Sequence, residues 1–451
     1  MAKEPITSYS SNQKSKISIS RDLAFRLLER IETQNLNSDD AVNDPEMDCL
    51  DVRDRHLTAE IIYGVLRRRA TLNWLLAGHS SRPWKDIPLK TKIILRMSLY
   101  QLWMLDRIPD HALVNDAVEL AKRELGEGVS RYINGILRSL ARLRPWTEKD
   151  WLAKAPEHAQ VSLPPWLWAR WRKRFGVAAA REYALSLLSP PRVAFRTGQN
   201  SKFEIPEELF GFTEKSDIVP GAFFATDEER GHELPQEAYI QDEASQLIPW
   251  LAGPLSPGAR IWDTCAAPGG KSAVFALMPC EGMLLVSSDS SPRRAKHLCS
   301  VLREVTAAPI VLAADARCAP PFRSAFNLVC ADVPCSGLGT LRRNPEIKWR
   351  IQPADFDDLC KTQLQILTSV STAVCPGGQL LYSTCSTEPE ENERVIKNFL
   401  KTHPDFRLLA PIQPAGIERW TGNDRMIRTF PSRRLWDGFF AALLVRNCSV
   451  P

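Results

Sequence analysis

Two cysteines stand where a thiol could do chemistry. Cys335 lies in the run DVPCSG and Cys385 in YSTCS, so small polar residues follow both. Each cysteine comes shortly after an apolar run, at residues 326–331 and 379–382, that predicts a buried strand. Because open α/β sheets bind ligands at the carboxyl ends of their strands, we expect both thiols at one such edge. Two thiols there suggest covalent group transfer.

A thiolate in such a place has a specific use on a nucleobase. C5 of cytosine is too weak a nucleophile to attack a methyl donor, but addition of a thiolate to C6 gives an enamine whose C5 can attack. The attacking cysteine needs a polar, accessible site that lowers its pKa from about 8.5. Cys335 and Cys385 fit this description. The other isolated cysteines are expected to be inert, buried thiols: Cys49, Cys280, Cys299, Cys318, Cys330, Cys360, Cys375 and Cys448.

A third predicted strand end carries a loop for a nucleotide-like ligand. Residues 263–272 read DTCAAPGGKS, but a phosphate loop needs glycine where Cys265 stands, and the pattern is not G-x-G-x-x-G. The run instead predicts a strand-to-helix turn whose paired glycines expose backbone N–H groups. Asp289, 19 residues beyond Gly270, suits a carboxylate that accepts hydrogen bonds from ribose hydroxyls.

Carboxylates recur at four successive predicted strand ends: Asp263, Asp289, Asp315 and Asp332. One aspartate in this position is usually just a helix cap. Four favour a cationic nucleoside ligand, and S-adenosyl-L-methionine with its sulfonium fits that description.

Composition limits the class of protein. A chain of 451 residues with 44% hydrophobic content can hold two or three domains with real cores. We expect a cytoplasmic protein and no membrane partner, because no window approaches 18 uninterrupted apolar residues and the first 20 residues lack a hydrophobic signal region. Eleven irregularly spaced cysteines and seven scattered histidines indicate neither a disulfide framework nor a metal site.

The hydrophobic period divides the chain into parts. A polar tail (1–17) precedes a helical domain (18–145), which Pro145 closes and in which residues 34–51 read as a loop. Connecting helices and a small α+β subdomain (146–245) lead to a C-terminal domain (246–451) in which strands and helices alternate. The predicted fold class is therefore a helical bundle followed by a Rossmann-like, doubly wound sheet. Its predicted strands are 260–263, 284–288, 310–313, 326–331, 379–382 and 439–445.

The net charge of +5 is spread unevenly. Residues 53–145 carry 17 Lys and Arg against 9 Asp and Glu. Such a segment can contact phosphates, although charge alone favours solvated helix faces. Tryptophans and arginines alternate in residues 166–175, where Trp168, Trp171 and Phe175 share one helical face, so a core helix is favoured over an RNA-stacking surface.

Two runs in the helical part, Val114–Lys122 (VNDAVELAK) and Tyr132–Arg138 (YINGILR), resemble the NusB-like RNA-binding domain. The resemblance implies an RNA-binding bundle, which the basic excess permits independently.

The motifs of the C-terminal part resemble the RNA 5-methylcytosine methyltransferases of the Sun/Nop2 type. They are DTCAAPGGKS (263–272), DVPCSG (332–337), RNPEIKW (343–349), STCS (383–386) and DGFF (437–440). The resemblance implies that Cys385 attacks the base and Cys335 assists product release, whereas the cysteine of a Pro-Cys motif attacks in DNA methyltransferases. It also implies that the following residues hold the cofactor: Cys265, Ala266, Ala267, Pro268, Gly269, Gly270, Lys271, Asp289, Asp315 and Asp332.

With the NusB-like part in front, the resemblance implies methylation of small-subunit (16S) ribosomal RNA by a monomer, before full subunit assembly. An exposed loop of naked RNA is the expected target, because a paired cytosine would have to be extruded. Two alternatives stay open. The catalytic motifs do not encode the substrate, so transfer RNA is one. A non-catalytic RNA-binding assembly or antitermination factor is the other, although intact cysteines and aspartates argue against it.

Overall fold

The computed structural model describes residues 17–105, 109–143, 152–197, 213–225, 238–430 and 436–448. The chain divides into two compact units, Met1–Leu188 with Asn344–Trp349, and Ser189–Arg343 with Arg350–Pro451. The helical and α/β fold classes are confirmed, and the domain boundaries at 145 and 245 stay predictions. Residues 1–16 of the expected tail, and Pro145, lie outside the described residues.

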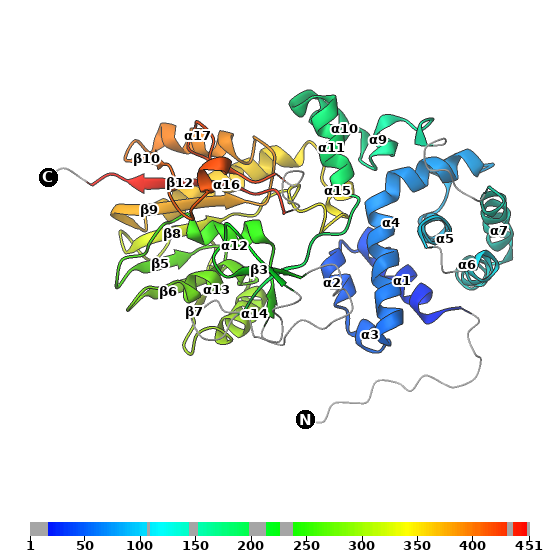
Figure 1. Ribbon diagram of the computed structural model, residues 1–451, viewed down its shortest axis with the longest axis horizontal. Helices are drawn as coiled ribbons and strands as arrows, with labels where there is room; N and C mark the ends of the chain where they lie inside the picture. The colour runs from blue at the N-terminus through cyan, green and yellow to red at the C-terminus, as the bar shows by residue number, and fades with distance from the viewer. Residues whose placement is uncertain are drawn as a thin grey trace. The chain divides into compact units, whose positions relative to one another are not determined.

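The first unit is helical (Figure 1). Helix α5 (Leu89–Met104) is buried on nearly every side, and it contacts α1 (Ile19–Thr33), α4 (Val52–His79), α6 (Asp110–Leu125) and α7 (Glu127–Ala141). Gly126 alone joins α6 to α7 and has φ 86°, a conformation that favours glycine. Further helices among the described residues of this unit are α9 (Glu157–Gln160), α10 (Pro165–Phe175) and α11 (Val177–Ser186).

The prediction of a loop over residues 34–51 was wrong, because this stretch holds two short helices, α2 (Ser38–Val42) and α3 (Pro45–Asp48). Its acidic residues act as caps and partners of basic residues. The Asp44 carboxylate accepts the Glu46 N–H at 3.1 Å and pairs with Arg30 at 2.6 Å, while Pro45 occupies the first helical position.

The core-helix interpretation of residues 166–175 is confirmed. Trp168 and Trp171 are buried in α10, and Trp171 stacks on Tyr183 of α11 with ring centroids 4.3 Å apart. Arg172 instead reaches Glu157 at 2.6 Å.

A short segment from far along the chain, Asn344–Trp349, belongs to the helical unit. Glu346 is 2% exposed, and its carboxylate accepts the N–H of Ser38 at 3.1 Å and the hydroxyl of Ser38 at 2.6 Å. Lys348 Nζ donates to the Arg67 carbonyl at 2.9 Å, and Trp349 Nε1 donates to the Leu66 carbonyl at 2.8 Å. Helices α2 and α4 thus hold the segment that begins nine residues after Cys335.

Burial of this segment predicts an unusual pH dependence of stability. Burial, and then the nearby charges of Arg67 and Arg68, lower the pKa of Lys348 to about 7. The unfolded chain therefore binds more protons than the folded chain between about pH 7 and pH 10.5, so this lysine makes stability rise with pH in that window. From pH 7 to pH 9, urea unfolding should show wild type gaining about 2 kcal/mol relative to Lys348→Met. Parallel pH dependences of the two proteins would contradict a depressed lysine pKa.

The second unit contains a sheet with the strand order β10-β12-β9-β8-β5-β6-β7, and β11 (Ile427–Arg428) pairs with β12 (Figure 1). Strands β5 to β9 are parallel in this sheet, and β12 runs antiparallel between β9 and β10. The bounds are β5 (Arg260–Asp263), β6 (Leu284–Asp289), β7 (Ile310–Ala313), β8 (Phe326–Asp332), β9 (Val374–Thr384), β10 (Phe406–Leu409) and β12 (Phe440–Arg446).

Helices cover both faces of this sheet. Helices α16 (Asp355–Ser371) and α17 (Glu393–Thr402) pack through Leu367 and Phe399 on the face that carries Val329 and Tyr382. Helices α12 (Glu243–Trp250) and α13 (Gly270–Leu277) pack on the other face, and α14 (Pro292–Arg303) lies beside β6 and β7. α15 (Ile347–Arg350) is a single turn, and all but its last residue belong to the first unit. The predicted strands are present, but β9 begins earlier than expected, and β10 and the two-residue β11 were missed.

A second, antiparallel sheet of the second unit has the order β2-β3-β1-β4 and lies within the residues predicted to form a small connecting subdomain. Its strands are β1 (Ala194–Thr197), β2 (Thr213–Lys215), β3 (Ala222–Ala225) and β4 (Ala238–Ile240). Within the described part of the chain, no helix is long and apolar enough to cross a membrane.

Candidate active site

The two cysteines of interest meet at the carboxyl ends of neighbouring strands. Asp332 ends β8 and pairs with Ser383 near the end of β9, so the loops that follow these strands leave the sheet side by side. Cys335 and Cys385, 50 residues apart in sequence, have their Sγ atoms 3.2 Å apart. This juxtaposition is the one expected from two parallel strands that end in register.

A cavity of 390 Å³ opens beside the thiols. This volume lies within the range of small-molecule sites. Seven of the twelve residues proposed from the sequence line it: Cys265, Ala267, Asp289, Asp315, Asp332, Cys335 and Cys385. The other five, which belong to the loop after β5 or begin α13, are not among the lining residues: Ala266, Pro268, Gly269, Gly270 and Lys271.

The loop between β5 and α13 needs its glycine for space as well as conformation. Gly269 has φ 122°, and a Cβ there would lie 3.0 Å from Leu298 and 3.2 Å from Val301 of α14. Asp263, at the end of β5, is fully buried and accepts the hydroxyl of Ser272 at 2.6 Å. Burial raises the pKa of Asp263 to about 7. Asp263 therefore braces the loop from within, and the other three strand-end aspartates face the cavity.

Asp289 and Asp315 each already hold an arginine. Asp289 Oδ1 accepts the Ser291 N–H at 2.8 Å and Arg294 Nε at 3.0 Å. Asp315 lies two residues beyond β7, and the Arg317 guanidinium pairs with it at 2.7 Å. The Arg317 side chain and backbone N–H lower the pKa of Asp315. This carboxylate is therefore ionised at neutral pH.

Asp332 links the cofactor-type loop to the cysteine strands. Its Oδ2 accepts Lys271 Nζ at 2.7 Å, and its Oδ1 accepts the Ser383 hydroxyl at 2.6 Å. Burial favours the neutral amine of Lys271, but the Asp332 carboxylate outweighs burial and raises the pKa of this lysine. Lys271 therefore remains an ammonium next to the thiol pair.

The two thiols share a hydrogen bond in which either sulfur can be the donor. The hydrogen bond with Cys385, followed by burial, raises the pKa of Cys335 well above its ordinary value. A Cys335 thiol that stays protonated can donate its hydrogen to Cys385 Sγ. Such a donor stabilises a thiolate on Cys385, so the arrangement can support Cys385 as the nucleophile and Cys335 as the proton-bearing partner.

The expectation that the other eight cysteines are buried is confirmed only for Cys330. Cys280, Cys299, Cys360 and Cys375 are half-buried. Cys49, Cys318 and Cys448 are exposed, since each lies outside helices and strands near an end of one. None of the three lines the cavity beside Cys385.

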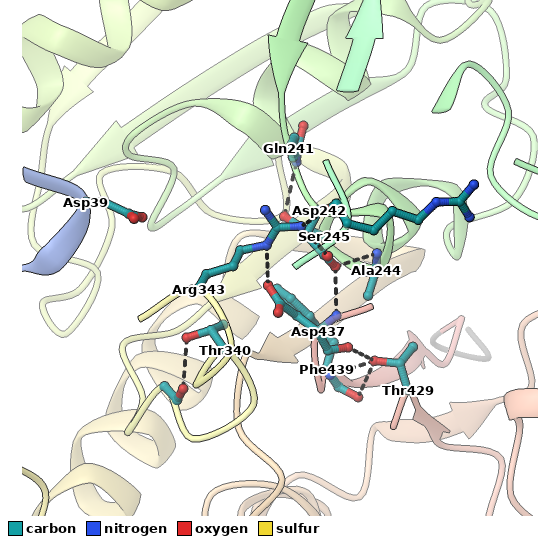
Figure 2. A network of polar contacts seen from close by, with 12 residues as sticks. Asp39, Gln241, Asp242, Ala244, Ser245, Thr340, Arg343, Thr429, Asp437 and Phe439 are labelled. Carbon is teal, nitrogen blue, oxygen red and sulfur yellow. Dashed lines mark hydrogen bonds and ion pairs between the residues drawn. The ribbon is translucent and has the colours of Figure 1, made fainter. Parts of the chain in front are cut away.

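A buried polar network not anticipated from the sequence supports the cysteine loops (Figure 2). Arg343 donates through Nη2 to Asp242 at 2.8 Å and through Nε to Asp437 at 3.1 Å. The Asp437 N–H donates to Asp242 Oδ1 at 3.1 Å, and the Thr429 hydroxyl donates to the Asp437 carbonyl at 2.7 Å. Burial and the neighbouring Asp242 raise the pKa of Asp437. Arg343 and Asp437 stand in recognisable motifs, but 94 residues separate them, so spacing gave no sign of the pair.

The network reaches Cys385 through two glycines. The Gly438 N–H donates to the Gly339 carbonyl at 2.8 Å, and the Gly339 N–H donates to the Cys385 carbonyl at 2.9 Å. The loop that carries Cys335 is thereby fastened to the one that carries Cys385.

Sequence reasoning also missed Glu391, which lies six residues after Cys385 in the acidic run EPEENE. Glu391 is fully buried, and its carboxylate contacts both cysteine loops. An acidic run ordinarily indicates a solvated surface, and nothing in the sequence marks which glutamate turns inward.

The two NusB-like runs meet at a cavity in the helical unit. This cavity, of 520 Å³, lies between α6 and α7. Its polar lining includes the amides of Asn115 and Asn134 and the guanidinium groups of Arg138 and Arg142. The arrangement combines groups that can pair with base edges and groups that can bind phosphate.

Solved structures share this fold. The crystal structure of PH0851 covers 97% of this chain and 100% of its own, with a TM-score of 0.75 and 24% identity. A methyltransferase homolog protein from Pyrococcus horikoshii matches 66% of this chain and 99% of its own, with a TM-score of 0.51 and 23% identity.

Family models and relatives match at the level of sequence. Residues 252–445 match the 16S rRNA methyltransferase RsmB/F model, and residues 18–142 match the NusB family model. The probable ribosomal RNA small subunit methyltransferase B of Bacillus subtilis is 33% identical over 408 residues, 86% of this chain and 89% of that protein. Its counterpart in Synechocystis is 30% identical over 94% of this chain and 98% of that protein. The chain therefore belongs to the RsmB/F family of methyltransferases and carries a NusB-family domain in front.

Proposed function

We propose that this protein methylates C5 of a cytosine in small-subunit (16S) ribosomal RNA, with S-adenosyl-L-methionine as methyl donor. The observation that carries the proposal is the pair of thiols, 3.2 Å apart, at the wall of a cavity lined by carboxylates. Cys385 attacks C6 of the base and forms the covalent adduct. Cys335 assists the elimination that follows methyl transfer: a base takes the C5 proton, the C5–C6 double bond forms again, and the Cys385–C6 bond breaks to release the Cys385 thiolate.

The cavity suits the proposed cofactor. Asp289 and Asp315 offer carboxylates to ribose hydroxyls and to a cationic centre, while Cys265 and Ala267 bring the backbone of the loop after β5 close. When bound, S-adenosylmethionine supplies an electrophilic methyl group. Its site and the thiols share one cavity, so the base on Cys385 need not move between two sites.

Asp289→Ala tests this assignment. Loss of the carboxylate should remove a charge-assisted ribose contact of about 1.5 to 3 kcal/mol, and so weaken S-adenosylmethionine binding about 10- to 150-fold in calorimetric titrations. Asp358→Ala, which removes an exposed carboxylate from α16, is the matched control and should bind like wild type. Equal affinities of the Asp289 variant and wild type would remove Asp289 from the cofactor site.

The helical unit is proposed to bind the RNA chain, and the second unit is proposed to bind the target cytosine beside the thiols. The amides and arginines between α6 and α7 suit single-stranded RNA, which fits a target on naked ribosomal RNA before the subunit is fully assembled. The protein is proposed to act as a cytoplasmic monomer without a metal.

Bisulfite mapping of total RNA tests the substrate. In RNA from cells that contain the protein, one cytosine of small-subunit ribosomal RNA should resist deamination by bisulfite. In RNA from cells without the protein, the same cytosine should be deaminated. Protection that moves to a transfer RNA would replace the proposed substrate. Identical maps, together with no transfer of labelled methyl to RNA in vitro, would favour a non-catalytic RNA-binding role.

A further inference from the structure

One buried carboxylate touches both cysteine loops. Glu391 is 0% exposed, and its two oxygens accept four hydrogen bonds. Oε1 accepts the Ser336 N–H at 2.7 Å and Gln363 Nε2 at 3.0 Å. Oε2 accepts the Ser336 hydroxyl at 2.6 Å and the Ser386 hydroxyl at 2.5 Å. Every one of these bonds uses the carboxylate as acceptor.

The two serines are the residues directly after the two cysteines. Ser336 follows Cys335, and Ser386 follows Cys385. Their hydroxyl oxygens lie 3.2 Å apart, the same separation as the two Sγ atoms. A single side chain therefore spans two loops that the sequence separates by 50 residues, at the position next to each thiol.

Glu391 is itself firmly held. Its backbone carbonyl accepts the hydroxyl of Tyr382 at 2.5 Å, and its N–H donates to the Glu388 carbonyl at 3.1 Å. Tyr382 is fully buried on β9, the strand that ends just before Cys385. The backbone of Glu391 is thus bonded to strand β9, while its carboxylate is bonded to both cysteine loops.

Burial of a carboxylate destabilises a folded protein more than burial of an apolar side chain of similar size. Burial raises the pKa of Glu391 even though its serine and glutamine donors act in the opposite direction. An apolar side chain would fill the same space without the desolvation of a carboxylate. Four converging donors, two from the Cys335 loop, one from the Cys385 loop and one from α16, instead suit a group that fixes one loop against the other.

We propose that Glu391 is a positioning residue that sets the separation and orientation of the Cys335 and Cys385 thiols. The assignment of catalytic roles to those thiols rests on the proposed function, whereas their spacing does not. With Glu391 in place, the nucleophile and its proton-bearing partner face the same atoms of the base. Without it, strands β8 and β9 remain, but the two loops lose the carboxylate that is bonded to both of them.

The test compares Glu391→Gln and Glu391→Ala with wild type, and Glu393→Gln is the matched control. Glu393 lies two residues on, pairs with Arg428 at 2.7 Å and carries the same charge. Glutamine keeps one acceptor oxygen, so its single-turnover rate of methyl transfer should fall about tenfold, and that of the alanine variant about a hundredfold or more. S-adenosylmethionine affinity should stay within about twofold of wild type, and Glu393→Gln should transfer methyl groups normally.

A second readout reports thiol spacing without any reaction on RNA. Phenylarsine oxide binds two thiols at once, and the part of its binding that Cys335→Ala removes belongs to this pair. Its affinity for the pair should fall at least tenfold in Glu391→Ala, and by less in Glu391→Gln. Normal dithiol binding and normal turnover in a folded Glu391→Gln would overturn the proposal, whether or not the alanine variant folds. If wild type transfers no methyl group to RNA, the proposed function fails, and dithiol binding still decides the role of Glu391.

Discussion

Cys385→Ala is expected to abolish methyl transfer, whereas Cys335→Ala is expected to trap the enzyme on its RNA. Without the Cys385 thiolate no enamine forms, so neither product nor covalent complex should appear. Without Cys335, attack and methyl transfer remain possible, but elimination from the methylated adduct is hindered. The trapped complex should survive denaturing electrophoresis.

The proposed asymmetry depends on the contact between the two thiols. The hydrogen bond with Cys385, followed by burial, raises the pKa of Cys335, whose Sγ lies 3.2 Å from that of Cys385. The double variant is the control and should yield no adduct. If the adduct forms with Cys385→Ala and not with Cys335→Ala, the two roles are reversed. If Cys335→Ala turns over normally and traps nothing, Cys335 only packs beside the nucleophile.

Gly339→Ala should be almost as damaging, although this residue has no reactive group. A Cβ at position 339 would lie 2.7 Å from the Gly438 carbonyl carbon, nearer still to its oxygen, and 2.9 Å from the Cys385 carbonyl oxygen. These are backbone atoms, so no side chain can turn aside. A clash costing about 3 kcal/mol or more should lower the single-turnover rate about a hundredfold or more, because the loops must separate.

Gly128→Ala is the matched control, since nothing lies within 4 Å of a Cβ added there in α7. It should leave methyl transfer unchanged and the helix slightly more stable. Single-turnover assays of both variants, with melting curves, make the comparison. A Gly339→Ala enzyme within about threefold of wild type would show that the two loops are not closely fastened.

The residues at the carboxyl ends of the strands could be predicted from the sequence, because apolar runs mark the strands and the polar residues that follow mark where they end. Cys335, Cys385 and three of the four aspartates came to one cavity for that reason alone. Strand β10 escaped because its four residues, FRLL, are too few for a period to show. Helices α2 and α3 escaped because they have only five and four residues, too few for an apolar period to show. Asp44 caps α3, and Ser38 of α2 bonds to Glu346, which is far along the chain.

The supporting contacts were beyond any pattern. Glu391 and Glu393 look alike in the sequence, yet one is fully buried and the other pairs with Arg428. The partners of Arg343 lie about a hundred residues away on either side. Long-range polar pairing depends on the final packing, which local composition does not encode.

The order in which the ribosome makes the chain delays completion of the helical unit. Residues 189–343, 155 in all, separate the main part of the helical unit from the segment Asn344–Trp349 that completes it. At ordinary translation speeds this interval is roughly 8 to 30 s. Until then Glu346 and Trp349 have not been made, so the hydrogen bonds from Ser38 to Glu346 and from Trp349 to the Leu66 carbonyl cannot form. The helical unit is therefore finished only after the Cys335 loop has been translated, and a chain that ends before residue 344 lacks one segment of this unit.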